Sequence, residues 1–256
     1  MKLFYKQYDG CRHHVYSILG VKIKLKLSSK ELKKIQGERG NRFILHKENG
    51  TIEEFPDLNG LKVVFYGKNH TLELWEPINF KPTDYSQSLF QFWGNNNRVT
   101  IKKSNKLIKH LMISMQKENN ELFIDEELGV ETLFLESGDT SNNKITIGRD
   151  CLIAKNVNIM ADDFHTVYDI NNPENVLNKP EQGITIGNHV WITRDASILK
   201  GVTIPDNTII ANKSIVTKSF TKENTFIGGI PAKVIKENVN WDSKGVEDYL
   251  NEIKKD

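Results

Sequence analysis

This chain has few cysteines, and we find in it neither a long apolar run nor a secretion signal. Its 256 residues include two cysteines, Cys11 and Cys151, which are too few and too far apart for a disulfide framework. No stretch reaches the roughly 18 consecutive apolar residues of a membrane-spanning helix. The N-terminus also lacks the apolar core of a signal peptide. We therefore expect a cytoplasmic protein.

Nucleotide-binding loops are missing as well, because the sequence contains neither GxGxxG nor GxxxxGK[ST]. The formal net charge is only +2, but residues 1–40 hold ten Lys and Arg against three Asp and Glu, which is +7 and leaves −5 for the remainder. A basic block of this kind suits an acidic membrane surface, nucleic acid or a polyanionic substrate, and equally an ordinary solvated surface.

What the chain does have is a period of six. Between residues 184 and 216 an aliphatic side chain returns at every sixth position: Ile186, Ile192, Ile198, Ile204, Ile210 and Val216. A second row of smaller residues lies two positions before each: Ile184, Val190, Ala196, Val202, Thr208 and Ser214. This period fits neither an amphipathic helix nor a single strand. It predicts a hexapeptide β-helix, a mainly β prism with one hexad on each of three sides.

A longer repeat precedes the hexads. The pattern Asn-x-aliphatic-x-aliphatic recurs every 23 residues, beginning at Asn97, Asn120 and Asn143. We interpret each unit as an 18-residue coil with about five extra residues at one corner. The predicted organisation is an N-terminal α/β cap at 1–58, the β-helix at 59–235, and a tail at 236–256.

Within the cap, alternation over residues 21–27 predicts a strand, Ser28 or Ser29 caps a short helix, and Asn49-Gly50 predicts a hairpin. In the tail, four apolar side chains share one helical face, so we expect a helix that lies back over the prism: Val246, Tyr249, Leu250 and Ile253.

The hexads are interrupted once. The next member of the Ile159 row is Ile186, which is 27 positions later, so about 21 polar residues (about 161–183) are inserted at one corner. Long loops in compact folds are usually functional or disordered. His165 is the one histidine of this loop and can act as a general base near neutral pH. Asp163 or Asp162 could orient its ring.

Three further residues are placed by the hexad register. His189 and Trp191 should project outward, where Trp191 contacts a ligand or a neighbouring subunit, or packs under the loop of its own chain. Cys151 falls on the inward row and should be buried, which removes it as a nucleophile. Only His165 and His189 are expected to share a corner, too few for a zinc site with three histidine ligands. We expect no metal.

Residues 184–241 resemble the hexapeptide-repeat acetyltransferases, whose fold is a left-handed parallel β-helix. Asp163–His165 before the long loop completes the resemblance, which covers about residues 97–241. The matching segments are Ile-Gly-Asn-His-Val-Trp-Ile (186–192), Ile-Leu-Lys-Gly-Val-Thr-Ile-Pro (198–205) and Gly-Gly-Ile-Pro-Ala-Lys-Val-Ile-Lys (228–236). Lys-Glu-Asn-Val-Asn-Trp (236–241) and the Asp-Phe-His context are most similar to bacterial capsular polysaccharide, or polysialic acid, O-acetyltransferases.

The resemblance implies acetyl-CoA as co-substrate and a homotrimer with each active site between two prisms. It implies His165 as catalytic base with Asp163 beside it, and Trp191 in the acetyl and acceptor pocket. The coenzyme A positions that it implies are Lys200, Gly201 and Ala211 for the pantetheine arm, and Lys233, with Lys218 and Lys236, for the phosphates. Thr193 departs from the family, which usually has glycine there, and should narrow the donor groove.

We therefore expect an O-acetyltransferase that modifies a sugar hydroxyl of a bacterial surface polysaccharide, with sialic acid as a candidate sugar. One alternative is N-acetylation of a nucleotide-linked amino sugar, and another is a non-catalytic scaffold or glycan-binding module. We expect no nucleic-acid partner. The basic N-terminal block could hold the enzyme peripherally at a membrane or dock an acidic polymer.

Overall fold

The computed structural model describes residues 4–8, 13–18, 21–26, 28–82, 87–179 and 183–254. Cys11, which is expected to form no disulfide framework with Cys151, lies outside them. At the N-terminal end, three strands form an antiparallel sheet in the order β1-β2-β3: β1 (Phe4–Tyr8), β2 (His13–Ile18) and β3 (Val21–Lys26). Helix α1 (Ser29–Glu38) follows, and Ser28 caps it in a reciprocal capping box with Glu31.

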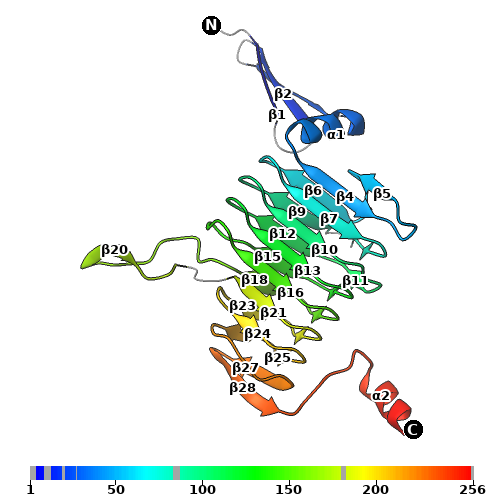
Figure 1. The fold of residues 1–256 in the computed structure, drawn as a ribbon, viewed down its shortest axis with the longest axis vertical. Helices are drawn as coiled ribbons and strands as arrows, with labels where there is room; N and C mark the ends of the chain where they lie inside the picture. Colours follow the sequence, from blue (N-terminus) through cyan, green and yellow to red (C-terminus); the bar gives the residue numbers. More distant parts are fainter. Residues whose placement is uncertain are drawn as a thin grey trace.

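From β4 to β28 the described chain winds into a three-sided prism, apart from one inserted arm (Figure 1). Each coil passes through three sheets in turn. The first sheet contains β5 (Ile52–Glu54), β4 (Arg42–His46), β7 (Thr71–Trp75), β10 (Arg98–Ile101), β13 (Glu121–Ile124), β16 (Lys144–Ile147), β21 (Ile184–Ile186) and β24 (Thr203–Ile204). Only β4 and β5 pair antiparallel in it. The predicted hairpin at Asn49-Gly50 is thus confirmed.

The other two sides are built in the same way. The second sheet contains β8 (Asn79–Phe80), β11 (Leu107–Ile108), β14 (Gly129–Val130), β17 (Leu152–Ile153), β22 (Trp191–Ile192), β25 (Ile209–Ile210), β27 (Thr225–Gly229) and β28 (Ala232–Glu237). The third contains β6 (Leu61–Phe65), β9 (Ser88–Phe92), β12 (Leu111–Met115), β15 (Leu133–Glu136), β18 (Val157–Met160), β23 (Ser197–Ile198) and β26 (Ile215–Val216).

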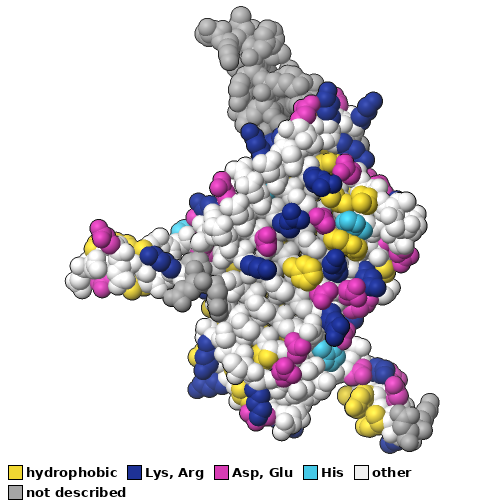
Figure 2. Space-filling view, viewed as in Figure 1, with side chains coloured by type: hydrophobic (Ala, Val, Ile, Leu, Met, Phe, Trp, Pro, Cys, Tyr) yellow, Lys and Arg dark blue, Asp and Glu magenta, His cyan; other side chains and the backbone are white. Residues whose placement is uncertain are grey.

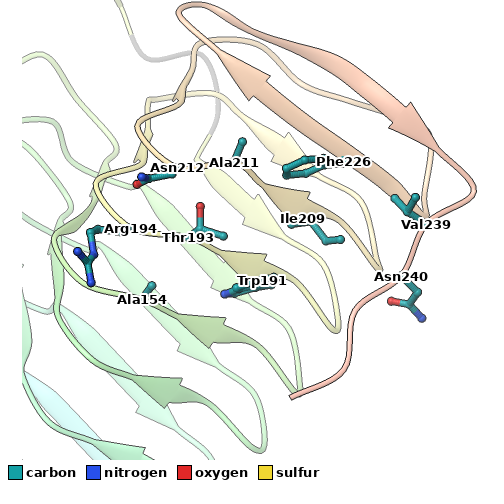
Figure 3. A pocket seen from close by; sticks show the side chains of 10 residues that line it. All are labelled: Ala154, Trp191, Thr193, Arg194, Ile209, Ala211, Asn212, Phe226, Val239 and Asn240. Atoms are coloured by element: carbon teal, nitrogen blue, oxygen red, sulfur yellow. The ribbon is translucent and has the colours of Figure 1, made fainter. Parts of the chain in front are cut away.

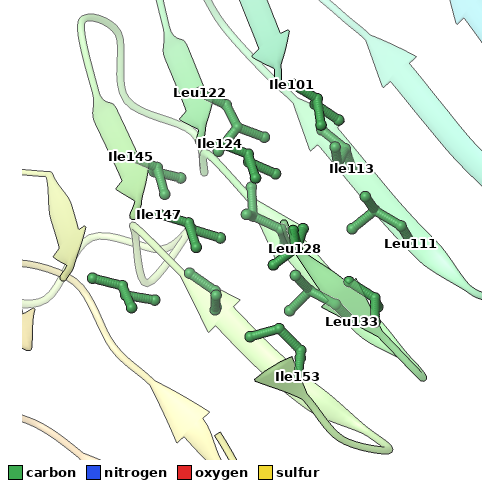
Figure 4. Packing of buried hydrophobic residues seen from close by; sticks show 14 of the residues in the cluster. Ile101, Leu111, Ile113, Leu122, Ile124, Leu128, Leu133, Ile145, Ile147 and Ile153 are labelled. Carbon is green, nitrogen blue, oxygen red and sulfur yellow. The ribbon is translucent and has the colours of Figure 1, made fainter. Parts of the chain in front are cut away.

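The core is the stack of inward hexad residues. Each inward side chain lies directly over its equivalent one coil later, as in Ile147, Ile186 and Ile204 of the first sheet. Every member of the two predicted rows is buried. Figure 4 shows the same inward packing in earlier coils, from Ile101 to Ile153. Burying one aliphatic side chain contributes about 1.5–3 kcal/mol to the free energy of folding. A single coil therefore gains little stability by itself, and the stacking of many coils stabilises the prism. The period-six prediction is confirmed.

A ladder of buried asparagines explains the 23-residue repeat. The Oδ1 of Asn97 accepts from the backbone N–H of Asn120 (2.9 Å), and the Oδ1 of Asn120 accepts from that of Asn143 (2.7 Å). The Nδ2 of Asn97 donates to the carbonyl of Trp93 (2.7 Å). Asparagine recurs there because its amide supplies both a donor and an acceptor to backbone groups that turn away from the strands.

His70 takes the asparagine position in an earlier coil. Its backbone N–H donates to the Oδ1 of Asn41 (2.9 Å), and its Nδ1 accepts from the backbone N–H of Asn97 (3.2 Å). Burial, with the nearby positive charge of Arg39, lowers the pKa of His70 from 6.5 to about 4. The imidazole is therefore an uncharged substitute for the ladder amide at neutral pH.

Replacing His70 with asparagine is expected to remove an acid sensitivity. Between pH 6.5 and about 4 the unfolded chain binds a proton at His70 that the folded protein does not bind. The contribution of His70 to the free energy of unfolding is therefore complete above this range. It falls by about 3 kcal/mol as the pH falls through the range. His70→Asn keeps the ladder acceptor and cannot titrate. Urea unfolding of both proteins at neutral pH and at about pH 4 measures the difference; equal losses in both would contradict it.

The structure differs from the sequence prediction in two places. Residues 1–58 were predicted as a separate cap, but β4 pairs parallel with β7 and joins residues 42–46 to the prism. The tail forms helix α2 (Val246–Ile253) as predicted, yet none of its residues is buried. Figure 1 shows it standing clear of the prism. The Lys244 ammonium, just before the helix, pairs with the Glu252 carboxylate in its last turn (2.5 Å). Both helices of the described chain, with ten and eight residues, are too short to cross a bilayer.

The inserted loop forms an arm. Beyond its base, β19 (Tyr168–Asp169) and β20 (Asn172–Val176) pair antiparallel, and the hairpin projects sideways from the prism (Figure 1). Figure 2 shows hydrophobic side chains gathered on this arm and on α2. The exposed ones are Val167, Tyr168, Ile170 and Leu177 on the arm, and Val246, Tyr249, Leu250 and Ile253 on α2. Apolar surface of this kind is typical of contact with another molecule.

Candidate active site

A pocket of about 650 Å³ opens on the outer face of the second sheet (Figure 3). Its wall is a column of outward side chains in register: Trp191 of β22 lies over Ile209 of β25, which lies over Phe226 of β27. Ala211 completes this apolar wall, and Arg194 and Asn212 line one end. The outward position predicted for Trp191 is confirmed, with 38% of the residue exposed. Thr193 also lines the pocket.

The pocket continues into a second hollow of about 640 Å³. Ala154, Trp191 and Arg194 line both, and the second hollow extends along the sheet past Leu152 to Leu107. Together the two form one groove across several coils, with Trp191 at its middle.

The chain after β28 closes the far side of the pocket, where Val239 and Asn240 line it. Trp241 fixes this segment because its ring stacks on His189 (centroids 4.3 Å apart, planes 8° apart) and its Nε1 donates to the His189 carbonyl (2.9 Å). The Nδ1 of His189 contacts the Asp150 carboxylate at 2.6 Å. His189 thus shapes the pocket from outside it, a role that no sequence pattern signalled, because its partners are 39 and 52 positions away.

Asp150 in turn joins this contact to an earlier coil, since its carboxylate also pairs with the Lys106 ammonium (2.5 Å). Partial burial raises the pKa of Asp150, but the hydrogen bonds from Lys106 and His189 outweigh it and hold that pKa below its usual range. The carboxylate is therefore ionised at neutral pH and supports the His189 ring.

His165 lies at a different place, at the base of the arm just after β18 of the third sheet. Its side chain is exposed. Its backbone is held on both sides, because its N–H donates to the Asp163 carbonyl (2.7 Å) and its carbonyl accepts from the Nδ2 of Asn178 (2.7 Å). Asn178 stands at the other end of the arm, so this contact fastens the two ends of the insertion together and fixes the backbone from which the imidazole projects.

Asp163 and Lys200, predicted to serve His165 and the pantetheine arm respectively, are joined to each other. The Asp163 carboxylate pairs with the Lys200 ammonium and accepts from the Nδ2 of Asn178 (3.2 Å). The Lys200 hydrogen bond and then that of Asn178 hold the pKa of Asp163 below its usual range. Asp162 accepts from the Thr140 hydroxyl and from the Phe164 N–H (3.1 Å). Both aspartates thus hold the base of the arm in place. A role of either carboxylate in orienting the His165 imidazole stays a prediction.

The remaining predicted residues are not among those that line the pocket. Lys236 of β28 is opposite Phe226 in the antiparallel pair, so it stands beside the pocket wall, and Lys233 is opposite Gly228. Lys218, Lys233 and Lys236 are exposed. Gly201 has a positive φ of 69°, which places a turn directly after Lys200. Of the coenzyme A residues predicted from sequence, Trp191 and Ala211 are brought together in the pocket.

Known proteins resemble the chain in sequence and in fold. No family model matches it. The chain is 35% identical over 170 residues to the polysialic acid O-acetyltransferase of Neisseria meningitidis, an alignment that covers 59% of this chain and 78% of that protein. Its fold resembles the crystal structure of the polySia specific acetyltransferase NeuO, with a TM-score of 0.65 and 29% identity, covering 81% of this chain and 80% of that one. The polysialic acid O-acetyltransferase OatWY gives a TM-score of 0.52 with 25% identity, covering 83% and 97%.

Proposed function

The chain belongs to the hexapeptide-repeat, left-handed β-helix acetyltransferases that include the polysialic acid O-acetyltransferases, and we propose that it acetylates a sugar hydroxyl of a bacterial surface polysaccharide. The acceptor class follows from the relatives, with sialic acid as a candidate sugar. The observation that carries the proposal is the alignment with a polysialic acid O-acetyltransferase over 78% of that protein. The chain is an O-acetyltransferase, and N-acetylation of an amino sugar is not favoured by these relatives.

The pocket at Trp191 fits the donor, acetyl-CoA. Coenzyme A combines a narrow pantetheine arm with phosphates that need cationic partners. Trp191, Ile209 and Phe226 give an apolar wall for the arm, and Arg194 and Lys236 stand at the edges of that wall. Lys233 and Lys218, exposed on nearby coils, are further candidates for the phosphates. Acetyl-CoA supplies the acetyl group as an activated thioester.

His165 is proposed as the general base. The imidazole takes the proton of the sugar hydroxyl as that oxygen bonds to the thioester carbonyl carbon, the carbon–sulfur bond breaks, and the proton passes to the departing thiolate. Direct transfer is favoured because the free cysteine of the described chain is unsuited to an acetyl-enzyme. Cys151 is completely buried, and burial raises the pKa of its thiol to about 12.

A complete site needs two copies of the chain. His165 stands at the corner after the third sheet, whereas the Trp191 pocket opens on the second sheet, and none of its lining residues comes from the arm. We therefore assign the site to a homotrimer in which His165 of one prism faces the Trp191 groove of the next. The apolar side chains exposed on the arm and on α2 support such an assembly.

Two predictions from the sequence remain proposals: a cytoplasmic location, and docking of the basic residues 1–40 on a membrane or an acidic polymer. If these residues dock an acidic polymer, the KM for the acceptor should depend on salt concentration. That salt dependence should weaken when the lysines are neutralised.

An acceptor panel tests the proposed function. The enzyme is incubated with acetyl-CoA and either capsular polysaccharides, polysialic acid among them, or a UDP-4-amino sugar. We expect acetyl esters on a polysaccharide, identified by their release in mild base, because a general base assists a hydroxyl nucleophile most. Amide product on the amino sugar alone would overturn O-acetylation. Absence of any thermal shift with coenzyme A would instead indicate the non-catalytic scaffold.

A further inference from the structure

A separate pocket of about 530 Å³ lies on earlier coils, at the corner that follows the third sheet. The side chains that line it come from the ends of β9 and β12 and from the turns beyond: Gln91, Trp93, Ser114, Gln116, Lys117 and Asp139. None of them belongs to the groove at Trp191. The donor site therefore does not account for this pocket.

Its central feature is a partly exposed indole that stacks on a tyrosine. Trp93 is 40% exposed, and its ring stacks on Tyr66 with centroids 3.7 Å apart and planes 11° apart. The asparagine ladder holds its backbone, since the Nδ2 of Asn97 donates to the Trp93 carbonyl (2.7 Å). Gly94 allows the next coil to approach closely, because a Cβ at that position would lie 1.8 Å from the Lys117 carbonyl oxygen. The aromatic surface is thus fixed before any ligand arrives.

Neutral hydrogen-bonding groups surround this ring. Gln91, Ser114 and Gln116 present amides and a hydroxyl, and the Nε2 of Gln116 donates to the Ser114 hydroxyl (3.3 Å). Lys117 and Asp139 pair with each other at 3.1 Å, so the pocket presents no uncompensated charge. An aromatic face flanked by neutral donors and acceptors suits a pyranose ring, whose C–H face stacks on the indole while its hydroxyls meet the amides. A phosphate would need an unpaired cation here.

The pocket lies along the corner that carries His165. Asp139, at its rim, is followed by Thr140, whose hydroxyl donates to the Asp162 carboxylate at the base of the arm. Strands β9, β12, β15 and β18 are consecutive neighbours in the third sheet. Three strand spacings of about 4.8 Å place Trp93 roughly 14 Å from the end of β18. A polymer that follows this corner can therefore reach both places.

We propose that the Trp93 pocket is a distal subsite for the acceptor, which holds one sugar ring of a polysaccharide while another unit of the same chain is acetylated near His165. The inference rests on the proposed function and deepens it, because it assigns assembled polymer rather than a monomeric sugar as the substrate. The subsite contributes binding along the polymer and takes no part in the acetyl transfer itself.

The test compares acceptor chain lengths in three proteins: wild type, Trp93→Ala and Trp75→Ala. Trp75 is the matched control because it is also a stacked indole, on His46 (4.0 Å, 7°), but lies on the first sheet outside the pocket. The acceptors are polysialic acid and a neutral capsular polysaccharide, each as short oligomers and as long chains. The neutral polymer shows whether the subsite needs only the sugar ring.

For wild type and Trp75→Ala, KM is expected to fall as the acceptor becomes long enough to reach from the Trp93 pocket to the site near His165. Trp93→Ala should lose this advantage of long chains, with about a tenfold rise in their KM and the change confined to KM rather than kcat. The same dependence on chain length in wild type and Trp93→Ala, or none in wild type, would overturn the subsite.

Titration of long polymer into each protein without acetyl-CoA separates the subsite from the enzyme activity. Weaker binding by Trp93→Ala than by Trp75→Ala supports the subsite even if no acetyl group is transferred, in which case the proposed function alone fails. Equal binding by the two variants, together with acetyl transfer to polymer, rejects the subsite and leaves the proposed function intact.

Discussion

The His165→Ala enzyme is expected to lose about 10²- to 10⁴-fold in kcat, the range that a general base contributes. The fold should persist because the His165 side chain is exposed and its backbone contacts with Asp163 and Asn178 do not involve the imidazole. Affinity for coenzyme A should also persist, since the residues lining the pocket lie on another sheet. Initial rates, thermal unfolding and a coenzyme A titration measure the three quantities.

His110→Ala is the matched control for this variant. His110 is also partly exposed on the prism, where its ring meets Phe134 edge-on (5.7 Å), and it lies outside the groove and the arm. We expect its turnover to stay near that of wild type. If His165→Ala also kept near-full turnover, the base would have to be another group and the proposed mechanism would fail.

The repeating part of the fold was predictable because repetition acts locally. In a β-helix, each inward position meets its own equivalent in the next coil, so the same residue type is required at a fixed interval, as for Ile147, Ile186 and Ile204. The interruption after Ile159 was visible for the same reason. It located the arm and His165 from the sequence alone.

Contacts between residues of different types leave no repeat in the sequence from which they could be predicted. Asp163 and Lys200 are 37 positions apart, and His189 and Trp241 are 52 apart, so no period connects them. His70 takes the place of an asparagine in the ladder because its Nδ1 accepts the same kind of backbone hydrogen bond. The residue type alone does not reveal this equivalence. The position of α2 also escaped prediction, because an apolar helical face does not say which surface will cover it.

The proposed division of the site between two faces predicts the second large effect. Trp191→Ala removes the aromatic centre of the groove, whereas His165→Ala removes the proposed base at the corner. If each site takes its base from one subunit and its groove from the next, neither variant can complete a site alone. In a trimer of mixed subunits, however, a chain with intact His165 can stand beside a chain with intact Trp191.

Activity after mixing the two variants therefore tests the central claim most directly. The two chains are unfolded, combined in equal amounts and refolded together, with each variant refolded alone as the control. Random assembly should restore about one quarter of wild-type activity, because one neighbouring pair in four joins an intact base to an intact groove. Activity no higher than the average of the two variants refolded alone would contradict a site shared between prisms.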